Sequence, residues 1–272
     1  MSILQRVESG GPGGVIALLT DFGTDDPFVG VMKAVIWGRC PGASIVDLTH
    51  AVMPQNVAEG AFWLERSFRW FAKGSIFVAV VDPGVGTERR ALAIEAHDRV
   101  FVGPDNGLLA AAVSSDPRRR VHEIDIVKMG LPAPSRTFHG RDVFAPVAAE
   151  LASRRVRPSD VGPDQRDFAA SPVPPLDVGL AEVSGTVLAV DRFGNLITNV
   201  TVESIAAFER PQVRIAEHEF PIRETYADVA PGDCLALVNA FGTVEIARRE
   251  GSAASFLDLG RGASVVVSRG KG

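Results

Sequence analysis

The sequence predicts an α/β fold: an N-terminal domain in which helices cover both faces of a mostly parallel sheet, followed by a smaller all-β domain. Continuous apolar runs of strand length, such as residues 15–20 and 74–81, alternate with segments of helical spacing. Beyond residue 175 the chain changes to short strands separated by Gly, Asp and Pro turns. That pattern is typical of a small β-barrel or a sandwich.

The first domain is expected to begin with a buried strand at residues 15–20 and a helix that Pro27 opens and that continues to residue 36. A second strand follows at residues 44–48. Residues 56–71 predict a helix, because apolar side chains recur there at three- and four-residue steps. The remaining predicted elements are strands at residues 74–81, 91–95 and 100–103, a helix that begins at residue 106, and a helix at residues 143–152.

The prolines at positions 172, 174 and 175 predict a stiff, extended connector between the two domains. We therefore expect an N-terminal α/β domain at residues 14–171, a linker at residues 172–181 and a C-terminal β domain at residues 182–270. The strands expected in the C-terminal domain are residues 185–190, 213–215, 234–238, 244–247 and 263–267.

Composition excludes several classes of function. The 272 residues are 46% hydrophobic, and the formal net charge of −5 without a lysine-rich run argues against a nucleic-acid partner. Cys40 and Cys234 lie far apart without metal-ligand spacing, which favours two reduced thiols. Residues 1–8 lack the apolar run of a signal peptide, and no apolar run is long enough to span a membrane. We therefore expect a soluble, cytoplasmic protein.

The most informative stretch is the end of the apolar run at residues 74–81, where Asp82 is followed by Pro83 and then by Arg89 and Arg90. Loops at the carboxyl ends of strands in open α/β sheets are where ligands bind. A plain turn would need the proline and the neighbouring glycines, but not an acid followed by a double arginine. We therefore favour a catalytic carboxylate at Asp82, with Arg89 as its partner.

Other strand ends carry polar side chains, each with a structural alternative. Asp21 follows the first strand, and it is either a site residue or a helix cap. His50 follows the second strand and is interpreted as a structural hydrogen-bonding residue rather than a catalyst. His139 precedes a helix, and the pattern fits a catalytic residue and a core histidine equally well. Residues 191–195 fit either a substrate loop or a simple β-turn.

Acid, guanidinium and imidazole groups on neighbouring loops indicate a site that activates water. The residues alone leave open whether the reaction is a metal-assisted hydrolysis or a metal-free displacement. The absence of HxH, HExxH and cysteine clusters weighs against zinc. Asp21, Asp25 and Asp26 keep a site for a hard cation possible.

Six sequence blocks follow one another along the chain: TDFGTDDPFVGVMKAVI (residues 20–36), DLTHAVMPQNVAEGAFWL (47–64), VVDPGVGTERR (80–90), GPDNGLL (103–109), TFHGRDVFAP (137–146) and DRFGNLITN (191–199). Together they resemble the S-adenosyl-L-methionine hydroxide adenosyltransferases, also called adenosine-forming S-adenosyl-L-methionine hydrolases. This family is related to the fluorinating and chlorinating enzymes. The resemblance extends from residue 15 to about residue 262.

The resemblance implies a three-layer α/β/α domain joined to a C-terminal β-barrel. It also implies a homotrimer with active sites between the N-terminal domain of one subunit and the C-terminal domain of the next. The implied reaction is hydrolysis of S-adenosyl-L-methionine to adenosine and L-methionine, without a metal or an organic cofactor. The catalytic triad of the family's hydrolases falls on Asp82, Arg89 and His139. The halogenating relatives have aromatic residues where Asp82 and His139 stand, so the chain resembles the branch that uses water.

In the implied mechanism, water attacks C5′ of the ribose in line with the departing sulfur. Arg89 holds Asp82 ionised, and His139 completes the hydrogen-bond network and is a candidate to take the proton. The resemblance also implies substrate-binding residues: Asp21 for the ribose hydroxyls, Thr137, Phe138 and Gly140 for the pocket near C5′, Phe193 for adenine, and Asp191 and Asn195 for the methionine end.

The chain departs from the halogenase pattern in two places. Gln55 stands where those enzymes have a tryptophan, and residues 239–242 read Asn-Ala-Phe-Gly where they have Asn-Ser-Arg-Gly. The second change removes a hydroxyl and a guanidinium, which alters the expected contacts with the methionine carboxylate.

Two other functions stay open on the sequence. One is a module that binds or senses adenosine or S-adenosyl-L-methionine without turnover. The other is a metal-dependent hydrolase that uses Asp21, Asp25 and His50.

Overall fold

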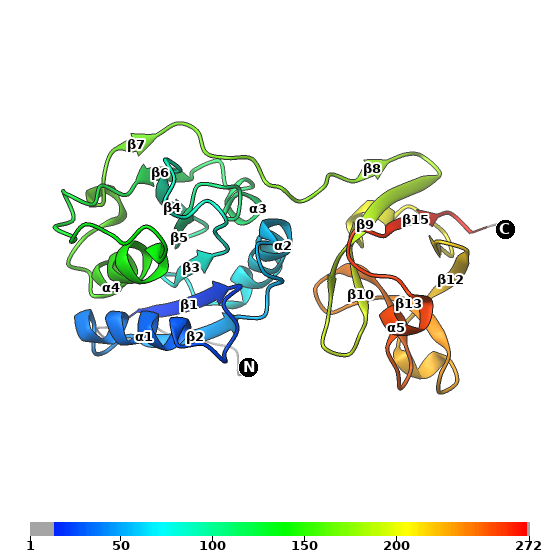
Figure 1. Ribbon diagram of the computed structural model, residues 1–272. Helices are drawn as coiled ribbons and strands as arrows, with labels where there is room; N and C mark the ends of the chain where they lie inside the picture. The colour runs from blue at the N-terminus through cyan, green and yellow to red at the C-terminus, as the bar shows by residue number, and fades with distance from the viewer. Residues whose placement is uncertain (1–13, 271–272) are drawn as a thin grey trace, which may run out of the picture. The chain divides into compact units, whose positions relative to one another are not determined.

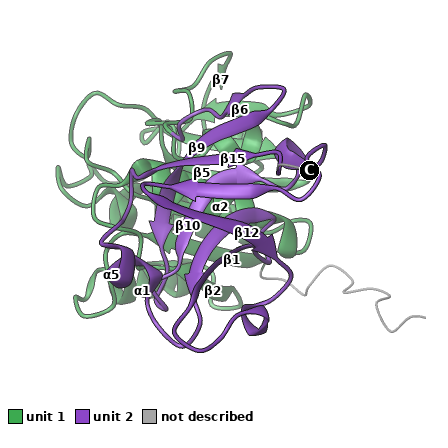
Figure 2. Cartoon of the chain, turned by 90° about the vertical axis from the view of Figure 1, so that its right-hand side faces the viewer, with its two compact units in different colours: residues 1–172 green, residues 173–272 purple. Residues whose placement is uncertain are grey.

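The structure is a computed structural model that describes residues 14–270 (Figure 1). The chain divides after Pro172 into two compact units, which Figure 2 colours separately. Residues 1–8, which we expected to lack a signal sequence, lie outside the described residues. None of the helices in the described part of the chain is long and apolar enough to cross a membrane.

Unit 1 contains a seven-stranded sheet with the order β2-β1-β3-β5-β4-β6-β7. Its strands are β1 (Val15–Thr20), β2 (Ser44–Thr49), β3 (Ile76–Val80), β4 (Ala91–Ala96), β5 (Arg99–Pro104), β6 (Arg120–Glu123) and β7 (Asp164–Gln165). The neighbours β2, β1, β3 and β5 pair in parallel, whereas β4 is antiparallel to both of its neighbours. The sheet is therefore parallel on one side and antiparallel towards β7.

Helices cover both faces of this sheet. On one face, α1 (Phe28–Arg39) and α4 (Ala145–Ala152) pack against alternate strand residues such as Ile16 and Val78. On the other face, α2 (Val57–Ser67) lies so close that a Cβ at Gly60 would approach Leu19 and Val81. The short helix α3 (Ala110–Val113) packs beside α2. This arrangement confirms the three-layer α/β/α fold.

Local sequence signals explain where the helices begin and end. The Asn56 side chain caps α2 by accepting a hydrogen bond from the backbone N–H of Glu59 at 3.1 Å. The helix expected to continue to residue 71 ends at Ser67, because Phe68–Trp70 turn into a 3₁₀ helix. The helix expected from residue 143 is preceded by a π-helical turn at Gly140–Phe144, and α4 follows it directly.

Unit 2 is a closed seven-stranded barrel, because β9 pairs with both β15 and β10. Its strands are β8 (Asp177–Val178), which pairs only with β9, and β9 (Glu182–Val190), β10 (Leu196–Thr201), β11 (Gln212–Ile215), β12 (His218–Arg223), β13 (Cys234–Val238), β14 (Thr243–Arg248) and β15 (Ser264–Ser268). One short helix, α5 (Ala253–Leu257), follows β14. Closure leaves the barrel strands without a free edge and confirms the predicted small barrel.

The topology of unit 1 places the polar strand ends together. β1 and β3 are adjacent and parallel, with Thr20 opposite Val80. Asp21 and Asp82 therefore leave the sheet at the same edge, where ligands bind in folds of this type.

Candidate active site

A cavity of about 420 Å³ opens at this edge of the unit 1 sheet. Four loops contribute to its lining: the loops after β1, β2 and β3, and the loop that leads into the π-helical turn. The residues expected at the site that line the cavity are Asp21, Asp82, Thr137, Phe138, His139 and Gly140. The structure thus brings all the predicted unit 1 site residues to one place, with Arg89 directly behind Asp82.

Asp82 and Arg89 form a nearly buried, bidentate ion pair. Arg89 Nε donates to Asp82 Oδ1 at 2.9 Å, and Arg89 Nη2 donates to Asp82 Oδ2. Only 5% of the Asp82 side chain and 10% of the Arg89 side chain are exposed. The guanidinium also lies 5.5 Å from the centroid of the Phe144 ring. Two parallel charge-assisted hydrogen bonds of this kind fix the orientation of the carboxylate.

The third predicted catalytic residue joins this pair through Arg89. Arg89 Nη2 donates to His139 Nδ1 at 2.8 Å. Because a guanidinium has only donors, Nδ1 must be the acceptor, and a neutral His139 carries its proton on Nε2. Burial and the neighbouring Arg89 lower the pKa of His139, which favours this neutral form.

This tautomer bears on the expected role of His139. Its Nδ1 lone pair is occupied by Arg89, and its Nε2 presents a proton rather than a lone pair. In this tautomer, the ring of His139 has one proton to donate and no free lone pair to accept another.

The loop that follows Asp82 is held in place by tight local contacts. Asn106 Nδ2 donates to the backbone carbonyl of Val81 at 2.8 Å. Gly86 has a φ of +78°, and a Cβ there would lie 2.2 Å from the carbonyl oxygen of Arg136. Only glycine fits this close approach. Gly86 thus lets the Asp82 loop pack directly against the segment that carries His139.

Asp21 is held by the backbone of a third loop. Its Oδ2 accepts a hydrogen bond from the backbone N–H of Gln55 at 2.7 Å. Gln55 has a φ of +66°, which is uncommon for a residue other than glycine. The Gln55 side chain also lines the cavity. Gln55 stands where halogenases have a tryptophan, and its backbone amide orients the carboxylate of Asp21.

An aromatic cluster forms another wall of the cavity. The ring centroids of Phe22, Phe28 and Phe138 are 5.3–5.9 Å apart, and Phe138 meets the other two edge-on. Phe28 is 44% exposed, although it lies among apolar neighbours. Sequence analysis did not single out Phe22 or Phe28. The signal for them was their place in the block that contains Asp21.

The structure does not gather the residues of the metal-dependent alternative. His50 is buried and faces Thr20 and Asp47 rather than the cavity. Neither Asp25 nor His50 lines the cavity that contains Asp21. Within residues 14–270, no group of three or more His, Cys, Asp or Glu side chains is arranged to hold a metal ion.

In unit 2, the three predicted residues belong to the loop between β9 and β10. Asp191 Oδ1 accepts hydrogen bonds from the backbone N–H groups of Phe193 and Asn195, both at 2.9 Å. Asp191 Oδ2 accepts from Asn195 Nδ2 at 3.0 Å. Asp191 thus organises its own loop, and the loop presents a Phe193 ring that is 76% exposed.

Phe193 and Asn195 also line a cavity of about 670 Å³ within unit 2. Two further residues of this cavity, Tyr226 and Arg248, were missed by sequence analysis. Tyr226 donates to the buried Glu245 at 2.8 Å, and burial raises the pKa of both side chains. Tyr226 is the only tyrosine in the sequence, and this is the feature that could have drawn attention to it.

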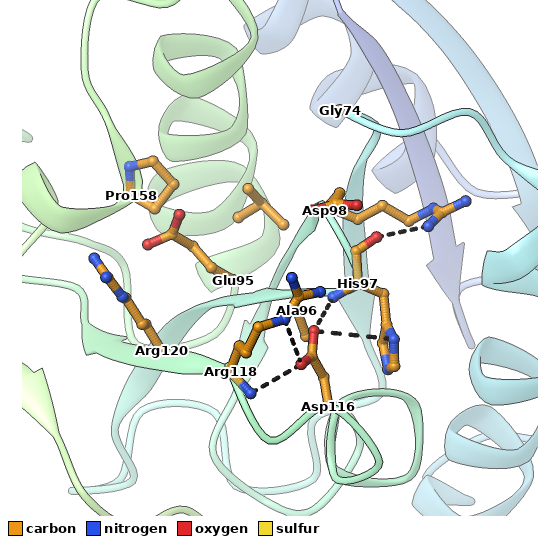
Figure 3. A pocket seen from close by; sticks show the side chains of 11 residues that line it. Gly74, Glu95, Ala96, His97, Asp98, Asp116, Arg118, Arg120 and Pro158 are labelled. Atoms are coloured by element: carbon orange, nitrogen blue, oxygen red, sulfur yellow. Dashed lines mark hydrogen bonds and ion pairs between the residues drawn. The ribbon is translucent and has the colours of Figure 1, made fainter.

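A second cavity of unit 1, of about 460 Å³, lies beside the hairpin between β4 and β5 (Figure 3). Charged side chains line it, but several are already paired. Asp116 accepts hydrogen bonds from the backbone N–H groups of His97 at 2.6 Å and Arg118 at 2.9 Å, and Asp98 pairs with Lys73. Since β4 ends and β5 begins here, this cavity lies at the edge of the sheet opposite to Asp82.

Comparisons with known proteins identify the family of the chain. The chain matches the model of the SAM hydroxide adenosyltransferase N-terminal domain over residues 16–162 and that of the C-terminal domain over residues 185–266. A relative from Thermus thermophilus named (R)-S-adenosyl-L-methionine hydrolase is 40% identical over 258 residues, covering 92% of this chain and 98% of the relative. A fluorinase from Actinopolyspora mzabensis is 27% identical over 299 residues, covering 94% of this chain and 97% of the fluorinase.

A solved structure shares the whole fold. The crystal structure of an uncharacterized conserved protein from Thermotoga maritima is 35% identical and superimposes with a TM-score of 0.85, covering 93% of this chain and 100% of that one. Family models match both units, and a relative at 40% identity spans almost the full length. The chain therefore belongs to the SAM hydroxide adenosyltransferase family.

Proposed function

We propose that this protein hydrolyses S-adenosyl-L-methionine to adenosine and L-methionine, by in-line attack of an activated water on C5′ of the ribose. The observation that carries the proposal is the hydrogen-bonded chain of Asp82, Arg89 and His139 at a cavity that also contains Asp21. Relatives at 36–40% identity that are named (R)-S-adenosyl-L-methionine hydrolase support it.

The chemistry asks for a site that orients one water molecule. Asp82 uses one lone pair on each oxygen for Arg89, so each oxygen keeps acceptor capacity for a water proton. His139 donates through Nε2 to the water oxygen and leaves the other lone pair of that oxygen to attack C5′. As the C–O bond forms, the water becomes a strongly acidic oxonium, so a weak base such as Asp82 suffices to accept its proton.

The leaving group needs no catalyst of its own. The C5′–S bond breaks as the C5′–O bond forms, and the electron pair of the broken bond neutralises the sulfonium. Methionine departs as a neutral thioether, so neither a general acid nor a Lewis acid is required. Alignment of water, C5′ and sulfur then supplies much of the remaining barrier reduction.

The substrate-binding roles follow the cavity walls. We propose that Asp21 binds both ribose hydroxyls, and that Thr137, Phe138 and Gly140 surround C5′. Phe193 packs on adenine. Asn195 contacts the methionine end, whereas Asp191 acts there mainly through the loop that it organises.

We further propose a cytoplasmic homotrimer in which the C-terminal unit of one subunit completes the site of the next. The two separate cavities support this, because the predicted substrate residues are divided between the units. The relatives' name specifies the R configuration, and we propose that this chain also acts on the R epimer at sulfur. S-adenosyl-L-methionine is a methyl donor that is costly to make, so its hydrolysis needs an explanation. Selective removal of the R epimer would provide one.

The proposal is tested by incubating the purified protein with each sulfonium epimer and measuring adenosine by chromatography, with and without a chelator. We expect adenosine and methionine in equal amounts, undiminished by the chelator. Loss of activity with the chelator would instead support a metal-dependent hydrolase. Calorimetric binding of adenosine without any product over hours would support a binding or sensing module.

A further inference from the structure

A buried chain of polar contacts runs behind the Asp21 loop and is not explained by the catalytic residues. His50 is only 6% exposed, and its Nδ1 lies 2.8 Å from the hydroxyl of Thr20, which is fully buried. Its Nε2 lies 3.0 Å from Asp47 Oδ1, and Lys33 reaches the other oxygen of Asp47 at 2.7 Å. These contacts connect the surface of the protein with the end of β1.

Which groups donate and which accept in this row of polar contacts follows from the chemistry of its members. The hydroxyl oxygen of Thr20 accepts a hydrogen bond from the backbone N–H of Phe22 at 3.2 Å, so the hydroxyl proton is available for His50 Nδ1. In that tautomer the ring proton is on Nε2, which lies 3.0 Å from Asp47 Oδ1 but is not aligned for a hydrogen bond with it. Burial by itself would raise the pKa of Asp47, but Lys33 and His50 lower it below its usual value, so the carboxylate is charged.

These contacts hold the residues immediately before and immediately after Asp21. Thr20 precedes it, and the Thr20 hydroxyl binds the N–H of Phe22, which follows it. The backbone carbonyl of His50 also accepts a hydrogen bond from Gly23 at 2.8 Å. His50 therefore holds the loop at two points, through its ring and through its backbone, while Gln55 holds the Asp21 carboxylate itself.

We propose that His50 is a positioning residue that, through Thr20, fixes the Asp21 loop and so sets the selectivity for a ligand with an intact 2′,3′-diol. This inference rests on the proposed function, in which Asp21 binds the ribose hydroxyls. A carboxylate binds two hydroxyls only when both of its oxygens face them, so a loop that is free to rotate loses this recognition before it loses the fold.

The test compares adenosine with 2′,3′-dideoxyadenosine by calorimetry, in wild type, Thr20→Val and Thr20→Ser. Wild type is expected to prefer adenosine by about tenfold or more. Thr20→Val removes the hydroxyl at similar volume, and we expect its preference to fall to about threefold or less, with unchanged affinity for the dideoxy ligand. Thr20→Ser keeps the hydroxyl and is expected to keep the preference. In turnover, Thr20→Val is expected to raise KM while kcat changes little.

A second pair of variants covers the case in which Thr20→Val does not fold. The Asn amide in His50→Asn falls near the position of Nδ1 and still reaches Thr20, whereas the Gln amide in His50→Gln falls near Nε2 and does not. We expect His50→Asn to keep more of the preference for adenosine than His50→Gln.

An unchanged preference in Thr20→Val, or an equal loss in Thr20→Ser, would overturn the inference, as would the reverse order of the His50 variants. These outcomes are distinct from failure of the proposed function. In that case, wild type would release no adenosine from S-adenosyl-L-methionine, whether or not it binds the two nucleosides.

Discussion

Three side chains of the candidate site differ in the hydrogen-bond donors and acceptors that each has free. Arg89 has only donors and uses them on Asp82 and His139. Asp82 keeps acceptor capacity, and His139 keeps a donor at Nε2. A single water can therefore be held with one proton towards Asp82 and its oxygen towards His139. On this basis we propose that Asp82 is the base and that His139 orients the attacking oxygen.

Asp82→Asn is expected to lower kcat by roughly 10²–10⁴-fold, because the amide is nearly the same size but is a poor proton acceptor. KM should stay within about threefold, since Asp82 acts on water rather than on the ligand. Steady-state adenosine release measures both constants.

Asp105→Asn is the control, because Asp105 is a buried carboxylate that pairs with the partly exposed Arg90, at 2.8 Å, outside the cavity. It should leave kcat within about twofold of wild type. An equal fall in kcat for the two variants would mean that Asp82 is a structural acid.

His139 predicts the pH dependence. Its pKa in the folded protein is below the ordinary value of 6.5. Above pH 6.5 the ring is neutral and accepts from Arg89, so kcat/KM should be independent of this group. As the pH falls through the lowered pKa, Nδ1 gains a proton and repels the guanidinium, and kcat/KM should fall. The stability contributed by the neutral ring is likewise present above pH 6.5 and lost on the acid side.

The measurement is kcat/KM against pH for wild type and His139→Gln. The variant should be slower at every pH and should lack the acid limb that belongs to the ring. An acid limb centred above pH 6.5, or one that persists unaltered in His139→Gln, would assign the titration to another group.

At the scale of secondary-structure elements, the site depends on how closely two loops approach each other. The segment after β3 and the segment before the π-helical turn meet where Gly86 packs on Arg136. This contact sets the distance between Asp82 and His139, which are far apart in sequence. A side chain at position 86 would separate the two loops and stretch the hydrogen bond between Arg89 and His139.

Gly86→Ala is expected to lower kcat/KM by about tenfold or more, and to destabilise the fold by roughly 2–4 kcal/mol through backbone strain and the clash with Arg136. Urea unfolding and adenosine release provide the two measurements. Gly74→Ala is the matched control, because Gly74 has a φ of +83° but no atom within 4 Å of its Cβ position. It should cost about 1 kcal/mol and leave kcat/KM intact. Equal effects of the two variants would show that the approach of the loops is unimportant.

Strands that consist of an unbroken apolar run were predictable from the sequence, whereas β6, β12 and the buried strand β10 were missed. β1 was predicted with its observed bounds, because an unbroken apolar run indicates a strand buried on both faces. β6 was missed because it begins with Arg120 after two further arginines, a composition that does not indicate a strand. The strand forms because its backbone pairs with β4 in the folded protein. β12 was missed because its charged residues and Pro221 weaken the strand pattern.

The candidate site was predictable in its residues but not in its contacts. The strand-end position indicated Asp82, and the family resemblance indicated His139. The tautomer of His139 depends on a hydrogen bond between residues 50 positions apart, which no local pattern reveals. The roles of Gln55 and Thr20 rest on a backbone amide and on a buried hydroxyl, neither of which has a composition signal.

At the scale of the whole molecule, the predicted substrate residues are shared between two units that each have their own core. If the site is completed between subunits, activity requires assembly. Light scattering is expected to give three times the 28.9 kDa chain mass. Dilution below the assembly range should reduce the specific activity together with the mass. Full activity in a species of single-chain mass would rule out a shared site.

The pairing of Arg89 with Asp82 has a consequence for the kind of nucleophile that the cavity accepts. Its Nε and Nη2 bind Asp82 and His139, and Nη1 reaches the backbone oxygen of Arg90 at 3.4 Å. A chloride ion that entered would find this guanidinium already neutralised and would face the negative charge of Asp82 instead. An uncharged water molecule meets no such repulsion, so we expect hydrolysis by this protein to be insensitive to added chloride.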